Sequence, residues 1–86
     1  MKEVWVFSYN AIYDCHGTSS YTSVFEDEKD GIAYLKEEVG IIKADHRIDR
    51  DGLFIDTDHE FRALSRNTDV FELSLKKREV KKKVTV

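Results

Sequence analysis

Residues 4–13 (VWVFSYNAIY) are the longest run of β-branched and aromatic residues in the chain, a composition typical of a half-buried strand. Aromatic residues dominate the odd positions, while Val4, Val6 and Ile12 occupy even positions. In a strand the two sets point to opposite faces. From Val4 to Phe7 both faces are apolar, which predicts a central strand covered on both sides at that end.

A second strand is predicted over Thr18–Phe25, because the segment is rich in Thr, Tyr and Val. The residues between the two strands, 14–17 (DCHG), are typical of a turn, so the strands are expected to pair antiparallel. The even positions of this second strand are mostly Thr and Ser. Such a polar strand is expected at the edge of the sheet, or with one face in water.

One amphipathic helix is predicted after residue 26. Asp27 is a plausible N-cap, and neighbouring acidic residues suit the positive end of the helix dipole. Apolar residues then recur at helical spacing, at Ile32, Leu35, Val39 and Ile42. We expect the helix to end at Gly40; the alternative is a helix that continues to Ala44 with Gly40 inside it.

The C-terminal half is predicted to be mainly strand. Leu53–Ile55 is a short apolar run, and Val70–Lys76 alternates apolar and polar residues in the manner of a strand. His59–Ser65 is ambiguous, since Thr57 and Glu60 also fit a capping box that would start a short helix through Leu64. We favour a strand there, because residues 66–69 (RNTD) are a good turn before the last strand.

These elements predict an α+β fold in which one helix packs on one face of an antiparallel sheet of four strands. The alternative is a sheet with a fifth, short strand. The element order is β-β-α-β-β. The expected core consists of Trp5, Phe7, Tyr9, Phe25, Ile32, Leu35, Val39, Phe71, Leu73 and Leu75. Val4 and Val6 would lie on the second face, where little of the chain remains to cover them.

Composition is consistent with this fold. The chain has 86 residues, 41% hydrophobic and 36% charged, which indicates one soluble globular domain over residues 1–86. The apolar run near the N-terminus is too short for a signal peptide or a membrane span, and the single cysteine excludes an intrachain disulfide. We therefore expect a cytoplasmic protein that does not associate with membranes.

Charge is distributed unevenly along the chain. Residues 1–75 hold 8 Lys and Arg against 16 Asp and Glu, whereas residues 76–86 hold 6 against 1. This basic C-terminal segment, together with aromatic residues such as Trp5 and Phe7, suggests nucleic-acid binding as an alternative function. The cations that would make the contacts are Lys76, Lys77, Arg78, Lys81, Lys82 and Lys83. The acidic body opposes this function, and the lysines also suit the protection of a sheet edge.

Three groups of residues are candidates for metal binding or nucleophilic chemistry. Asp49, Asp51 and Gly52 match half of a calcium loop, but Arg47 stands where the first acidic ligand belongs. The remaining candidates are the residues Cys15, His16, His46 and His59 and the acidic run Asp56, Asp58 and Glu60. Neither set has the ligand spacing of a structural zinc site. We expect no catalytic residue, no metal site and no cofactor, with a small metal or thiol protein as the third possibility.

An uncovered apolar patch on a small sheet usually marks a binding site for another protein or for a second copy. Val4 and Val6 are therefore the expected interaction residues. The preferred function is a non-enzymatic interaction or accessory module, with a protein partner or a homodimer favoured over nucleic acid.

The succession VWVFSY, SVFEDEKDGIAYLKEE and VFELSLKKREV resembles small uncharacterised proteins of bacteriophages and other bacterial mobile elements. The resemblance covers most of the chain and departs from the pattern at Gly31, where such helices more often carry alanine. It defines no site residues. It implies a cytoplasmic accessory protein that acts by binding, a class that includes inhibitors of host defence nucleases such as anti-CRISPR proteins.

Overall fold

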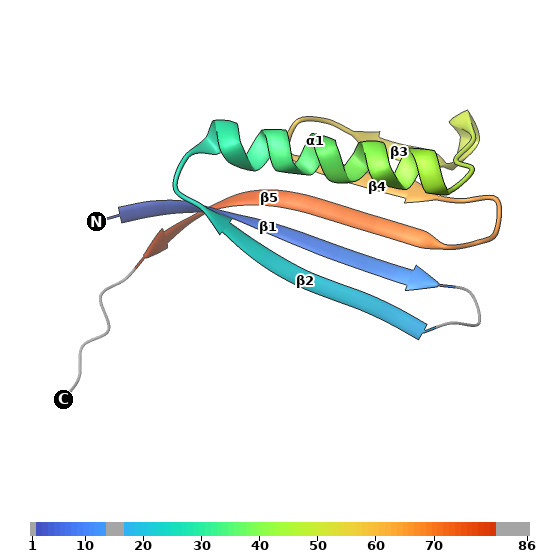
Figure 1. Ribbon diagram of the computed structural model, residues 1–86, viewed down its shortest axis with the longest axis horizontal. Coiled ribbons are helices and arrows are strands. Elements are labelled where there is room, and N and C mark those ends of the chain that lie inside the picture. Colours follow the sequence, from blue (N-terminus) through green and yellow to red (C-terminus); the bar gives the residue numbers. More distant parts are fainter. Residues whose placement is uncertain (1, 14–16, 81–86) are drawn as a thin grey trace.

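The computed structural model describes residues 2–13 and 17–80 and contains five strands, one α-helix and one short 3-10 helix (Figure 1). Their bounds are β1 Lys2–Tyr13, β2 Gly17–Phe25, α1 Glu28–Asp45, the 3-10 helix Arg50–Gly52, β3 Leu53–Asp56, β4 Glu60–Leu64 and β5 Val70–Val80. The fold is α+β, as predicted. The element order is β-β-α-β-β-β, so the count of four strands is wrong and the fifth strand is present.

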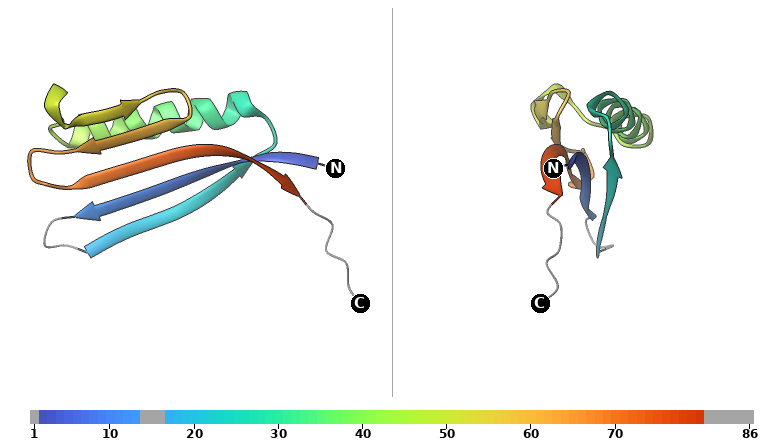
Figure 2. Two further views of the ribbon diagram at one scale, coloured as in Figure 1. Left: turned by 180° about the vertical axis from the view of Figure 1, so that it is seen from behind. Right: turned by 90° about the vertical axis from the view of Figure 1, so that its left-hand side faces the viewer.

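All five strands belong to one sheet in the order β2-β1-β5-β4-β3, and every neighbouring pair is antiparallel. The first and last strands of the chain lie side by side, with β1 paired to β5 over eleven residues from Lys2 to Ile12. β2 is an edge strand, as its polar composition predicts. Figure 2 shows that the sheet is strongly twisted and that α1 lies on one of its faces.

The ambiguous segment before β4 is resolved by the side chain of Thr57. Its Oγ1 accepts hydrogen bonds from the backbone N–H groups of Glu60, at 3.0 Å, and His59, at 3.4 Å. The hydroxyl also donates to the backbone oxygen of Glu60. Thr57 therefore closes the turn between β3 and β4 instead of capping a helix, and the strand prediction for this segment is confirmed.

The predicted end of the helix at Gly40 is wrong. α1 continues through Gly40 to Asp45, one residue beyond the end given by the alternative. Asp27 occupies the N-cap position as expected, but its side chain makes no capping hydrogen bond. The extension buries Ile42, which is only 4% exposed. Burying an isoleucine side chain gains roughly 2–3 kcal/mol, more than the ~1 kcal/mol that a glycine costs in a helix. Packing therefore carries the helix past Gly40.

The core lies between α1 and the sheet. Seven of the ten predicted core residues are buried there, while Trp5, Phe25 and Ile32 pack against its margin. Four buried hydrophobic residues were not predicted: Ala11, Ile42, Phe61 and Ala63. The helix lies close to the sheet at Gly31, where a Cβ atom would lie 2.7 Å from the Cδ1 atom of Leu75. Glycine in place of the expected alanine thus permits this close packing.

The expectation that the Val4 end of β1 is covered on both sides is wrong. Helix α1 covers the face that carries Trp5 and Phe7, and among residues 2–13 and 17–80 no element lies over the opposite face (Figure 2). Val4 and Val6 are half-buried there by their neighbours in the sheet. Within the described ranges, no helix is both long and apolar enough to cross a membrane.

Candidate interaction surface

The face of the sheet opposite α1, here called the open face, carries the even-numbered side chains of β1 and β5. The register places Val6 directly between Val24 of β2 and Lys76 of β5. Val4 lies opposite Arg78 in the same way. Side chains that are directly opposite in an antiparallel sheet have Cβ atoms about 4.5–5.5 Å apart, so these residues form one continuous surface.

We call this surface the valine patch and define it by Val4, Val6, Val24, Lys76 and Arg78. Val24 is its most exposed apolar member, with 63% of its surface accessible. Neither of the two cations forms an ion pair with any residue that the structure describes; Arg78 donates only to the neighbouring backbone oxygen of Lys77, at 3.2 Å. The patch therefore combines apolar surface with two cations that are available to a ligand.

The valine patch unites residues that the sequence assigned to two competing functions. Val4 and Val6 were the candidates for protein binding, and Lys76 and Arg78 for nucleic-acid binding. Lys77 does not join them, because it lies opposite Trp5 on the helix-covered face and forms a 3.0 Å ion pair with Glu3. Lys81, Lys82 and Lys83 lie outside the described residues.

The centre of the open face is polar. A hollow of about 310 Å³ is lined there by side chains of β1, β4 and β5, including those of Ser8, Asn10, Glu60, Arg62, Glu72 and Ser74. Arg62 and Glu72 face each other across β4 and β5, with 3.7 Å between Nε and Oε1. Mixed charge of this kind gives the central region no net preference for a cationic or an anionic ligand.

A second apolar row crosses the open face at its far end. The register aligns Leu64 of β4, Val70 of β5 and Ile12 of β1 in neighbouring strands. Ile12 is 54% exposed. Neither this row nor Val24 was predicted as part of a site. The alternation within each strand placed them on the correct face, but only the cross-strand register shows that they are adjacent.

The central aromatic residues of β1, Phe7 and Tyr9, are not available for base stacking. Phe7 is fully buried and Tyr9 is 9% exposed, both beneath α1. The ring of Phe7 packs edge-on against Tyr34 of the helix, with 5.0 Å between centroids. Phe7 and Tyr9 therefore form core, which removes the centre of the stacking platform from the nucleic-acid hypothesis; Trp5 and Tyr13 at its two ends are partly buried.

The acidic run at Asp56, Asp58 and Glu60 does not converge on a metal site. Asp56 pairs with Lys43 and Asp58 with Lys36, each at 3.0 Å, so both carboxylates face α1. Glu60 lies opposite Ser74 on the open face instead. His59 contributes to the same contact with the helix, because its Nε2 is within hydrogen-bond distance of the Glu28 carboxylate, at 3.0 Å. These pairs brace the β3–β4 turn against the helix.

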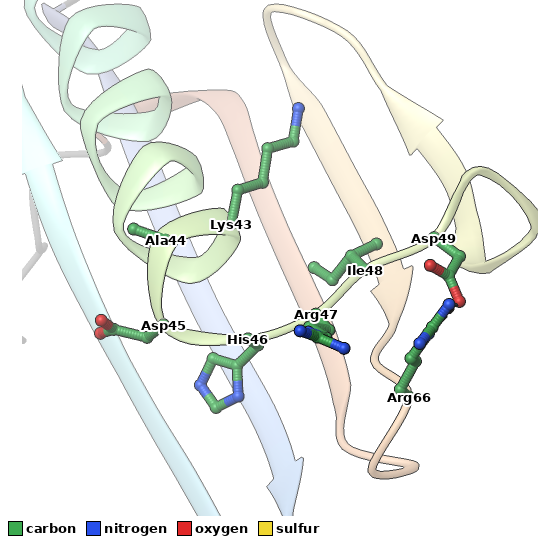
Figure 3. Close-up of a pocket in the computed structure, with 8 residues that line it drawn as sticks. All are labelled: Lys43, Ala44, Asp45, His46, Arg47, Ile48, Asp49 and Arg66. Carbon is green, nitrogen blue, oxygen red and sulfur yellow. Dashed lines mark hydrogen bonds and ion pairs between the residues drawn. The ribbon is translucent and has the colours of Figure 1, made fainter.

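The loop after α1 surrounds a wide, open hollow of about 650 Å³ (Figure 3). The carboxylate of Asp49 and the guanidinium of Arg66 point toward one another in this view and lie 2.6 Å apart. His46 packs against the ring of Phe71, and its Nδ1 is 3.6 Å from Asp69. Asp49 and Arg66 thus tie two sides of the hollow together, and His46 packs on the core beside it; none of the lining groups is a nucleophile placed beside a base.

The calcium-loop candidate is part of this loop. Residues 50–52 form the 3-10 helix, and the carboxylate of Asp49 accepts a hydrogen bond from Nε of Arg66. Within the described part of the chain, no group of three or more metal-binding side chains is close enough to hold an ion. Cys15 and His16 lie outside it.

Comparisons with protein-family models, with curated proteins and with solved structures find no match for this chain.

Proposed function

We propose that this chain is a non-enzymatic protein-binding module and that the valine patch is the centre of its binding surface. The observation that carries the proposal is the union of Val4, Val6 and Val24 with two cations on a face that α1 leaves open, neither of which has an ion-pair partner among residues 2–13 and 17–80. Exposed apolar surface rimmed by polar groups is typical of protein interaction sites.

The side chains of the valine patch indicate which kind of partner surface would bind it. Apolar side chains favour a partner that buries hydrophobic surface, and Lys76 and Arg78 favour carboxylates beside it. The partner we propose is therefore a protein surface that presents apolar residues flanked by Asp or Glu.

Affinity capture with matched variants tests this proposal. Bait proteins would be the wild type, the double variant Val4→Lys/Val6→Lys, and the control Asn10→Lys, which adds a charge at an exposed position of the same face. The lysate would be bacterial and nuclease-treated, with a wash at about 0.5 M salt, where the Debye length is only a few ångströms.

We expect one or more proteins to be retained by the wild type and by Asn10→Lys and lost from the double variant, with circular dichroism showing that all three baits are folded. Retention of the same proteins by all three baits would show that the valine patch is not the binding surface.

Nucleic-acid binding is the second candidate function. The observation that favours it is the placement of Lys76 and Arg78 on one face, where neither pairs with a carboxylate of the part of the chain that the structure describes. If two phosphate contacts carry the affinity, the logarithm of the association constant for single-stranded nucleic acid should fall with the logarithm of salt with a slope of about −1.4. Binding that survives 0.5 M salt would exclude this mode, and apolar contacts would then carry the interaction.

A further inference from the structure

Strand β2 forms a long, open edge of the sheet. It is the outermost strand, and its nine residues pair with β1 in one continuous register from Gly17 to Phe25. Figures 1 and 2 show no other element of the described chain beside its outer edge. Along that edge, alternate residues direct backbone N–H and C=O groups away from the sheet.

The sequence of β2 carries none of the usual protection of an edge strand. Gly17–Phe25 (GTSSYTSVF) contains no charged residue and no proline, and its pairing with β1 has no bulge. Natural proteins normally place charges, prolines or bulges on exposed edges, because an unpaired strand is a template for another strand. A nine-residue edge without them is therefore suited to pairing.

The other two open edges of this sheet are protected. β3 is only four residues long, its register with β4 is irregular between Leu53 and Ile55, and it ends in Asp56. The last part of β5 extends past β4, whose pairing stops at Ser74, and it carries Lys76, Lys77 and Arg78. The contrast within one sheet indicates that β2 is the edge that is available for a partner strand.

We propose that β2 pairs antiparallel with β2 of a second copy of this chain, so that two five-stranded sheets become one continuous sheet. In the register that uses all nine residues, Tyr21 lies on the two-fold axis and Ser20 lies opposite Thr22 of the second copy. Such a pair forms roughly eight or more backbone hydrogen bonds. The hydroxyl side chains of Ser20 and Thr22 also suit direct cross-strand hydrogen bonding.

Charge favours a second copy in this orientation. Glu26, Asp27 and Glu28 follow β2 directly, so each β2 has an acidic end and a neutral end. Antiparallel pairing places the two acidic ends at opposite ends of the joined strands, roughly 30 Å apart. Parallel pairing would place six carboxylates side by side. Self-pairing therefore needs no complementary charge from a different partner. It also gives hydrogen-bond partners to the unpaired backbone groups of β2 on both molecules.

This inference rests on the edge of β2 and not on the valine patch, so it stands independently of the proposed function. The two-fold axis is perpendicular to the sheet, which keeps both open faces on the same side of the joined sheet. A dimer would consequently present two valine patches to one partner surface.

Sedimentation over a concentration series, from about 1 µM to 1 mM, tests the proposal. We expect the wild type to change from a 10.0 kDa species to twice that mass. The double variant Ser20→Lys/Thr22→Lys places lysines opposite each other across the two-fold axis, and its dissociation constant should rise at least tenfold. The control Asn10→Lys adds one positive charge to β1, one strand further in, and should associate as the wild type does.

Hydrogen exchange of the wild type provides a second measurement that does not depend on any variant. Amides within residues 17–25 should become more protected as concentration rises, while those of β3 should not change. A wild type that stays at 10.0 kDa throughout would overturn the proposal. It would also be overturned if Val4→Lys/Val6→Lys abolished association and Ser20→Lys/Thr22→Lys did not, because the contact would then be on the open face.

Discussion

Two glycines of α1 have opposite structural roles. Gly40 is exposed, and a Cβ atom at this position would meet nothing within 4 Å, whereas at Gly31 it would press on Leu75. Gly40→Ala should therefore raise the free energy of unfolding by about 1 kcal/mol through helix propensity alone. Gly31→Ala gains the same propensity but overpacks a buried contact, which costs about 1–3 kcal/mol.

Urea unfolding of the two variants measures this difference. Gly40→Ala is expected to be more stable than the wild type, and Gly31→Ala is expected to be less stable than Gly40→Ala by at least about 1 kcal/mol. Equal stabilisation by both substitutions would contradict the close approach of the helix to β5.

Tyrosine residues make the stability of the protein sensitive to high pH. Burial raises the pKa of Tyr9 and of Tyr21 above the ordinary value of 10.0, and hydrogen bonds to Tyr13 and Tyr34 act in the same direction. Above pH 10 the unfolded chain therefore loses these protons while the folded chain retains them. Stability should be unaffected by these groups below about pH 9 and should fall as pH rises beyond 10.

Unfolding free energies between pH 8 and 11 test this expectation. The variant Tyr9→Phe removes one of the two groups, so its alkaline loss should be smaller than that of the wild type. A wild-type stability that stays constant or increases through pH 11 would contradict it.

The local sequence predicted the burial of most core residues correctly. It did not decide between two structures where one side chain can make its hydrogen bonds in either of them. Thr57 fits a capping box by spacing, and its hydroxyl instead binds the backbone of His59 and Glu60 in a turn. Both arrangements satisfy the same hydroxyl. Only the pairing of the next residues with β5 decides between them, and a local pattern does not contain that pairing.

At the scale of elements, residue composition and alternation located the segments of all five strands, although β2 and β3 contain no fully buried residue. The end of the helix was harder to predict, because Gly40 acts locally and Ile42 acts through tertiary burial. The cost of a glycine in a helix, about 1 kcal/mol, can be read from the sequence, but the free energy gained by burying Ile42 depends on the position of the sheet. The sequence alone therefore could not decide which of the two is larger.

Besides the backbone pairing of β4 with β5, apolar contacts hold the β3–β4 hairpin to the body of the protein. Phe61 is fully buried, whereas the ion pairs Lys36–Asp58 and Lys43–Asp56 are between exposed side chains. Phe61→Ala should therefore cost about 3–5 kcal/mol, and Lys36→Ala less than ~1 kcal/mol.

Urea unfolding at about 0.05 M and 1 M sodium chloride compares the two contributions, because salt screens exposed ion pairs. Only a small loss of wild-type stability is expected at high salt. A loss as large as that of Phe61→Ala would show that the ion pairs, and not the buried ring, hold the hairpin.

At the scale of the whole molecule, the order of the strands was not predictable from the chain. β1 and β5 are separated by most of the sequence, yet their pairing forms the centre of the sheet. This pairing brings Val4 beside Arg78 and Val6 beside Lys76. The sequence supplied these residues as two separate candidate sites, and the register between distant strands made them one surface.

Site-specific photo-crosslinking tests the central claim, that the valine patch binds a protein, most directly. A photoreactive residue would replace Val4 within the patch or, as the control, Ile41, an exposed apolar residue of α1. In nuclease-treated lysate we predict a cross-linked protein partner from position 4 and none from position 41. Cross-linking from position 41 alone, or to nucleic acid from position 4 in untreated lysate, would contradict the claim.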